Sequence, residues 1–109
     1  MNLEINQATT DEKVIVMLSG EVDAYTAPKL REVLIPLTEQ SGNQVVINLA
    51  NVSYIDSTGL GIFIGALKSS HTHQSKISLQ GLTSRVERLF RITGLDEVID
   101  IEDKREEAK

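Results

Sequence analysis

The chain has 109 residues, enough for one domain with a modest core, and its 40% hydrophobic but only 4% aromatic content predicts a core of Leu, Ile and Val. A formal net charge of -5 argues against a nucleic-acid surface, which needs a basic stripe, and is compatible with a basic protein partner. The absence of cysteine excludes a disulfide framework and any Cys-based metal or thiol site.

The sequence also lacks the apolar stretches of an exported or membrane-bound chain. Its longest strictly apolar run, Val14 to Leu18, is far shorter than the ~20 residues of a membrane span. Residues 1–7 do not combine a basic region with an apolar stretch, so no signal peptide is expected. We therefore expect a soluble cytoplasmic protein that contacts neither nucleic acid nor membrane.

Two strands are predicted near the N-terminus. Residues 3–5 alternate between apolar and polar, which is typical of a half-exposed edge strand. Residues 14–18 are apolar at every position, which predicts a strand covered on both faces and ended by Gly20. Residues 21–25 are then expected to form a loop with two carboxylates, one of them Asp23.

A first helix is predicted to begin after Thr26, the expected N-cap. Pro28 falls in its first turn, where a missing N–H group costs nothing. Apolar side chains then repeat with helical spacing over residues 30–37. Pro36 predicts a kink one turn earlier or an early end, and Gly42 is the expected C-terminal stop.

A buried strand followed by a helix forms the centre of the sequence. Residues 45–49 predict the strand, and the helix should run from Ser57 to about Ser70. Its inward face is predicted to carry Leu60, Phe63, Ile64 and Leu67. Asp56 would lie at the N-cap, where N–H groups lack intrahelical partners and the helix dipole is positive. Such a turn is most often only a cap, so by itself it establishes no site.

The glycines of this helix do not complete a nucleotide-binding motif. Gly59, Gly61 and Gly65 form G-x-G-x-x-x-G, which is one residue longer than the dinucleotide fingerprint. Neither a P-loop nor G-x-S-x-G occurs in the chain.

A polar segment and one further strand and helix complete the pattern. His71 and His73 could be half of a metal site, but no third ligand has suitable spacing, so residues 69–75 are expected to be a solvated loop. Residues 76–80 predict a parallel strand ended by Gly81.

The last helix is predicted to start with a capping box, Ser84-x-x-Glu87. Its apolar face would consist of Val86, Leu89 and Phe90, and Gly94 would close it. Residues 98–101 predict a short strand, and residues 102–109 a frayed helix or a disordered tail.

This order of elements predicts a single α/β domain over residues 1–109. The sheet should be mostly parallel and mixed, with four to five strands, an N-terminal edge strand and three to four helices. Partners of such sheets meet the carboxyl ends of the strands. Asp23 and the pair Asp56 and Ser57 should therefore lie at the same edge. Two acidic loops that flank one exposed serine favour a functional site over a simple helix cap.

Four segments together resemble a known family. They are Gly20-Glu-Val-Asp23, Ala27-Pro28 with Leu30-Arg31, Asp56-Ser-Thr-Gly-Leu-Gly61, and Leu89-Phe90-x-Ile92-Thr-Gly-Leu95. The pattern is similar to STAS domains of the anti-sigma factor antagonist class from about Val14 to Ile101. Within that class it resembles the antagonists of the anti-sigma-B factor in the general stress response of Gram-positive bacteria. The D-S-[ST]-G-[LI]-G hexapeptide is fairly specific, and the upstream G-E-[VI]-D strengthens it.

The resemblance implies a transcription regulator that is not an enzyme and needs no cofactor. The unphosphorylated protein would bind an anti-sigma factor that is also an ATP-dependent serine kinase, and so free the sigma factor. The kinase would phosphorylate Ser57 and dissociate the complex, and a metal-dependent serine phosphatase would reset it. Thr58 would be a contact or a secondary acceptor. Partner contacts are expected from Asp23, Asp56, Thr58, Gly59, Gly61 and Ile62.

Three other classes of function have weaker support in the sequence. Catalysis by Ser57 would need a base within hydrogen-bond reach, but both histidines should lie at the other end of its helix. A nucleotide-binding module would use the helix N-terminus, yet it lacks the glycine fingerprint and its lysine. A STAS scaffold or sensor module in a larger signalling assembly is the third alternative, and the missing second domain favours a free-standing switch.

Overall fold

The computed structural model describes residues 2–10 and 13–102 and places five strands in one mixed sheet, in the order β1-β2-β3-β4-β5. The strands are β1 (Leu3–Thr9), β2 (Lys13–Val22), β3 (Gln44–Ile55), β4 (Lys76–Gln80) and β5 (Asp100–Glu102). The helices are α1 (Ala27–Thr38), α2 (Ser57–His73), α3 (Ser84–Ile92) and the 3-10 turn η1 (Leu95–Glu97). Among the described strands, only β1 is antiparallel to its neighbour. The predicted α/β architecture with an N-terminal edge strand is therefore confirmed.

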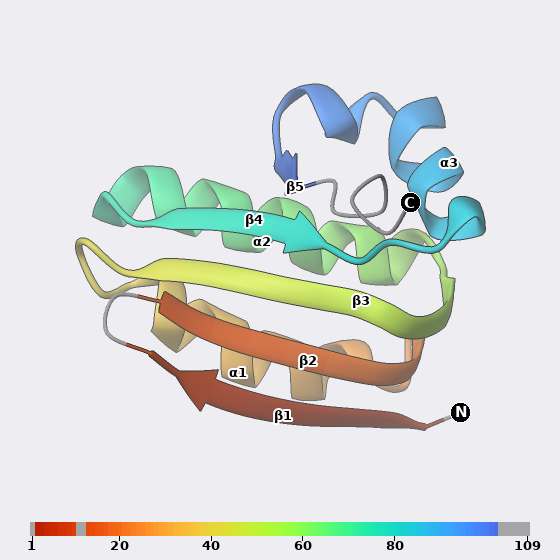
Figure 1. The fold of residues 1–109 in the computed structure, drawn as a ribbon, viewed down its shortest axis with the longest axis horizontal. Helices are drawn as coiled ribbons and strands as arrows, with labels where there is room; N and C mark the ends of the chain where they lie inside the picture. Colours follow the sequence, from red (N-terminus) through yellow and green to blue (C-terminus); the bar gives the residue numbers. More distant parts are fainter. Residues whose placement is uncertain (1, 11–12, 103–109) are drawn as a thin grey trace.

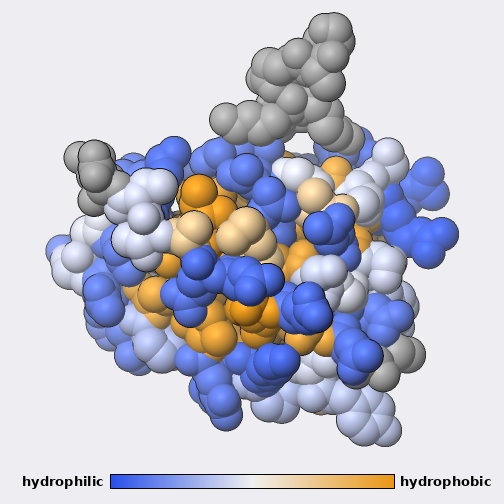
Figure 2. All heavy atoms as spheres, turned by 60° about the horizontal axis from the view of Figure 1, so that its bottom comes forward, coloured by the Kyte–Doolittle hydropathy of each residue, from blue (hydrophilic) through white to orange (hydrophobic). Residues whose placement is uncertain are grey.

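The two longer helices cover only one face of the sheet. Figure 1 shows α1 and α2 behind the sheet, whereas α3 lies beyond β4 at the end where β3 finishes. Strand β2 accordingly alternates, because Val16 and Leu18 are buried while Met17 is 36% exposed. The prediction that this strand is covered on both faces was wrong. Figure 2, with the bottom of that view turned forward, shows apolar surface among hydrophilic side chains.

Strands β2 and β3 are both longer than predicted. Gly20 does not end β2, because the β2–β3 ladder continues to the pair Val22 and Ile55 through two irregularities in register. Gly20 instead has a φ of 125°, and an added Cβ would clash with the carbonyl oxygen of Asn2, the residue before β1. Glycine is required there because the left-handed backbone and the close approach both exclude a side chain. The predicted loop over residues 21–25 therefore shortens.

The ends of α1 and α2 both differ from the predicted ones, because α1 stops at Thr38 rather than at Gly42 and α2 is longer than predicted. Helix α1 continues two residues past Pro36, so the early end did not occur. Helix α2 includes His71 and His73, which were predicted in a loop. The Nδ1 atom of His73 lies 2.9 Å from the carbonyl oxygen of Ser69, and Gln74 caps the helix with a φ of 61°. This hydrogen bond and cap extend the helix through a polar sequence.

The inward face of α2 differs from the predicted one. Its buried residues are Gly59, Leu60, Phe63, Ala66 and Ser70, whereas Ile64 and Leu67 are only half-buried. The buried face of α2 therefore includes the small residues Gly59 and Ala66, which let the helix lie close to the elements packed against it. The ring of Phe63 meets Phe90 of α3 edge to face, with centroids 5.8 Å apart.

Helix α3 begins one residue earlier than predicted, because its N-cap is Thr83 rather than Ser84. The hydroxyl of Thr83, not of Ser84, accepts the hydrogen bond from the Val86 N–H at 3.2 Å. Ser84 is instead the exposed first residue of the helix. The predicted C-terminal strand is present as β5, which includes Glu102, and the rest of the predicted tail lies outside the described residues. No helix in the described ranges is long and apolar enough to cross a membrane.

The corrected helix face gives a stability prediction. Phe63→Ala should lower the free energy of unfolding by about 3–5 kcal/mol, because it removes a fully buried ring and its partner contact. The half-buried Ile64→Ala on the same helix should cost less than about 2 kcal/mol. Urea denaturation of both variants measures the difference. Equal losses would mean that Ile64 faces the core after all.

Candidate functional site

The carboxyl ends of β2 and β3 meet at one edge of the sheet. Val22 and Ile55, their last residues, are register partners, and the Asp56 N–H donates to the Val22 carbonyl at 3.1 Å. The loop after β2 therefore lies beside the start of α2. The prediction that Asp23 and Ser57 share this edge is confirmed at the level of the backbone.

Ser57 is held at the first position of α2 by the residue before it. The Asp56 Oδ1 atom accepts from the Gly59 N–H at 2.9 Å, and the Asp56 carbonyl accepts from the Leu60 N–H at 2.9 Å. Ser57 and Thr58 are both exposed. Within the described residues, the Ser57 hydroxyl makes no hydrogen bond. This hydroxyl is therefore free to react, at the positive end of the helix dipole.

Asp23 is a buried carboxylate that shapes the loop into α1. It is 5% exposed, and its Oδ1 atom accepts from the N–H groups of Tyr25 at 2.9 Å and Thr26 at 3.1 Å. The Thr26 hydroxyl in turn accepts from the Asp23 N–H and donates to the Glu21 carbonyl. Thr26 thus occupies the expected N-cap position but braces the loop, since it makes no side-chain cap bond. The Asp23 Oδ2 atom is buried without a partner among the described residues.

Gly59 fixes the distance between α2 and the end of β2. It is buried, and an added Cβ would lie 2.7 Å from both the Cγ1 atom and the carbonyl oxygen of Val22. Gly59 is therefore buried in a packing contact with Val22, whereas the sequence analysis predicted that it would contact a partner. Gly61 is exposed, and an added Cβ would meet no heavy atom within 4 Å.

A hollow of about 560 Å³ lies beside Ser57, between α1 and α2. Thr58 and Ile62 line it from α2, and Pro28, Arg31 and Ile35 are among the residues that line it from α1. The sequence analysis identified the α2 side but missed the α1 side. The sequence pattern predicted only that these α1 residues belong to a helix. It contains no local signal that two helices will lie on either side of a groove.

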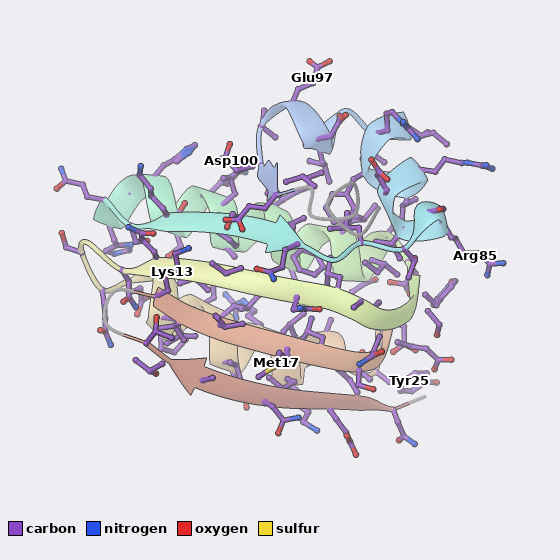
Figure 3. The ribbon with its side chains drawn as sticks, viewed as in Figure 1. Lys13, Met17, Tyr25, Arg85, Glu97 and Asp100 are labelled. Atoms are coloured by element: carbon purple, nitrogen blue, oxygen red, sulfur yellow. The ribbon has the colours of Figure 1, made fainter. Side chains whose placement is uncertain are left out.

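Tyr25 is a second feature that the sequence analysis missed. It is 86% exposed and follows Asp23 at the same end of the sheet, where Figure 3 shows it pointing away from the ribbon. The chain has only four Phe and Tyr residues, and both Phe are fully buried. The signal available in the sequence was an aromatic residue in the loop after Asp23 of an aromatic-poor chain, because aromatic residues are enriched at interfaces.

The histidines cannot serve Ser57 as a base. His71 and His73 lie in the last turn of α2, and Ser57 begins that helix. In residues 2–10 and 13–102, no three His, Asp or Glu side chains come together in a way that could hold a metal ion. The arrangement therefore offers a free hydroxyl, nearby carboxylates and a groove.

Comparisons with known proteins extend over nearly the whole chain. The family model described as "STAS domain" matches residues 3–108. The anti-sigma-B factor antagonist of Staphylococcus epidermidis is 45% identical over 101 residues, which cover 93% of this chain and 94% of that protein. The corresponding protein of Staphylococcus aureus strain NCTC 8325 is 43% identical with the same coverage.

Solved structures show the same fold. An anti-sigma factor antagonist from Mycobacterium paratuberculosis aligns with a TM-score of 0.78 at 25% identity, covering 98% of this chain and 91% of that one. SpoIIAA of Bacillus in its phosphorylated form aligns with a TM-score of 0.72, covering 96% of each chain. Because the sequence identity of the second match is only 22%, that match shows a shared fold and nothing further.

The two glycines give a matched pair of variants. Gly59→Ala should lower the free energy of unfolding by about 1–3 kcal/mol, because its Cβ has no room beside Val22. Gly61→Ala should instead raise it by up to about 1 kcal/mol, since alanine favours a helix and the site is open. Thermal and urea unfolding measure both changes. A Gly59→Ala protein as stable as the wild type would contradict the close contact.

Proposed function

The chain belongs to the STAS-domain family of anti-sigma factor antagonists, and we propose that its unphosphorylated form binds an anti-sigma factor that is also a serine kinase. Binding would release the sigma factor. The kinase would then transfer phosphate from ATP to the Ser57 hydroxyl, the complex would dissociate, and a metal-dependent serine phosphatase would restore the active form. The relatives named for the anti-sigma-B factor support a partner of that type. The observation that carries the proposal is the exposed, unbonded hydroxyl of Ser57 at the edge shared with Asp23.

Ser57 is a better acceptor candidate than the other hydroxyl at a helix start. Ser84 is also the exposed first residue of a helix, so exposure does not separate the two. Neither Ser84 nor Ser57 lines the α1–α2 hollow, but Ser57 is the direct chain neighbour of Thr58, which does, whereas Ser84 lies at the start of α3. A partner that fills the hollow would therefore bring its catalytic groups to Ser57.

The hollow itself suits a protein partner. Ile35 and Ile62 offer apolar contact, while Arg31 and Glu32 offer one charge of each sign. Tyr25 lies at the same edge and is exposed, as is common for residues that dominate binding energy. Thr58, Ile62 and Tyr25 are the contacts that we propose for the anti-sigma factor.

Phosphorylation would act on binding rather than on folding. A phosphoserine carries about −1.5 to −2 charges at pH 7. Beside Asp56 and the buried Asp23, this charge would repel a packed partner and hold water at the contact. The N-terminus of α2 would offset part of the charge, because its N–H groups and dipole favour anions. The fold should therefore survive while the interface is lost.

The first test maps the phosphate. Incubation with the cognate kinase and ATP should add one phosphate, which mass spectrometry should locate on Ser57. Ser57→Ala should abolish the transfer but still bind the partner, and Ser84→Ala should be phosphorylated like the wild type. A phosphate on Thr58 or Ser84 of the wild-type protein would contradict the assignment.

The second test concerns the groove. Ile62→Ala should weaken partner binding about tenfold, or ~1.4 kcal/mol, because it removes apolar contact from the hollow. Leu67→Ala is the matched control, since Leu67 is also a half-buried residue of α2 but does not line this hollow. Calorimetric titration of both variants, with melting temperatures measured in parallel, separates binding from stability. Equal losses of affinity would remove the groove from the interface.

The third test asks whether charge repulsion causes the dissociation. Ser57→Asp should weaken partner binding at least about tenfold, but less than phosphorylation, because a carboxylate is smaller and carries one charge. Asp23→Asn keeps an acceptor oxygen for the loop and removes the neighbouring charge. In the double variant, part of the lost affinity should therefore return. Strict additivity in this calorimetric cycle would favour steric exclusion instead.

A further inference from the structure

A second hollow, of about 220 Å³, lies between the end of β3 and α3. Tyr54 lines it from β3, and Arg85, Arg88 and Ile92 line it from α3. It shares no lining residue with the α1–α2 hollow. Its rim exposes large apolar groups, since Tyr54 is 46% and Ile92 74% accessible to solvent. The switch proposed for Ser57 does not use this exposed apolar surface.

One face of α3 lines this hollow. Its four lining residues on that face follow the spacing i, i+3, i+4 and i+7: Arg85, Arg88, Leu89 and Ile92. The buried residues of α3 are Val86, which also contributes to the hollow's lining, and Phe90. The helix therefore has an apolar side toward the core and a mixed basic and apolar side toward solvent.

The positive charge on α3 stands out in an acidic chain. The helix carries Arg85, Arg88 and Arg91 but one acid, Glu87, whereas the whole chain has a net charge of -5. All three arginines are exposed, and within the described residues none of them forms an ion pair or a hydrogen bond. Figure 3 shows Arg85 extending away from the ribbon. No carboxylate of the described residues therefore pairs with these guanidinium groups.

The chemistry of this surface selects one kind of occupant. The hollow is smaller than a usual small-molecule site of roughly 300–1,000 Å³, and it fits one or two apolar side chains. Arginines at its rim can each hold a carboxylate through two parallel hydrogen bonds. The apolar rim and the chain's net negative charge disfavour nucleic acid. Residues 103–109 contain no large apolar side chain of the kind that such a hollow would take.

We propose that the β3–α3 hollow is a second docking surface, which binds an acidic amphipathic segment of a protein partner. One or two large apolar side chains of that segment occupy the hollow, and flanking Asp or Glu residues pair with Arg85 and Arg88. Because the two hollows share no residues, this surface can be occupied independently of the one beside Ser57. The proposal does not depend on phosphorylation.

Two synthetic peptides test it. Both have 14 residues and the same leucines spaced i, i+3 and i+7, but one carries Glu and the other Lys at the flanking positions. Each is titrated into the isotope-labelled full chain and followed by amide NMR. The Glu peptide should shift Tyr54, Leu89 and Ile92 saturably, with a dissociation constant below about 1 mM. The Lys peptide should bind at least about tenfold more weakly.

Variants of the chain separate the proposed contacts. Arg85→Glu with Arg88→Glu should weaken the Glu peptide at least about tenfold and strengthen the Lys peptide. Arg31→Glu, at the other hollow, should change neither affinity. Ile92→Ser should also weaken binding, and its high exposure keeps that variant folded if the double variant is not.

Four results would overturn the proposal. They are equal affinity for both peptides, no saturable shift, shifts centred on Thr58 and Ile62, or peptide-free shifts that grow with protein concentration and so identify a second copy as the occupant. Phosphate transfer to Ser57 by the kinase is measured on the same variants, so a failure here is distinguishable from a failure of the switch.

Discussion

The close contact between α2 and the last residue of β2 determines the geometry of the site. Gly59 lies against Val22 with no space for a side chain, and the Asp56 N–H bonds to the carbonyl of the same valine. These contacts place the first turn of a long helix at the edge where the loop from β2 begins. The free hydroxyl, the buried Asp23 and the α1–α2 hollow lie together because this contact is fixed.

The site separates residues that build it from residues that are free to bind. Asp23, Asp56 and Gly59 are committed to backbone hydrogen bonds or to packing. Ser57 and Thr58 are exposed beside them, and their side chains make no hydrogen bond within the described residues. In the proposed switch, a charge added at Ser57 would stand beside residues that are already held by hydrogen bonds and packing, so its effect would fall on a bound partner.

Much of this architecture was predictable because it depends on local pattern. Strand β4 was predicted with its observed bounds, and Asp56 was recognised as a cap from its place between strand and helix. The end of β2 was missed because Gly20 looks like a terminator, although the β2–β3 ladder continues past it.

The remaining misses involve contacts between distant segments. The face of α2 was misjudged because apolar spacing favoured Ile64, whereas the folded chain buries the small Gly59, which lies against Val22 of β2, and Ala66. The cap of α3 was misjudged because adjacent hydroxyls at 83 and 84 satisfy the same local rule. Neither groove could be derived from the sequence, since each is made by elements that meet only in the folded chain.

The most direct test compares the protein before and after phosphorylation of Ser57. Amide hydrogen exchange across α2 and partner affinity are measured on both forms of the same preparation. The account predicts unchanged protection of the amides from Gly59 to Ala66 and a loss of affinity of at least about tenfold. Loss of protection along α2 would show that phosphorylation acts by unfolding the site, and unchanged affinity would show that Ser57 is not the switch.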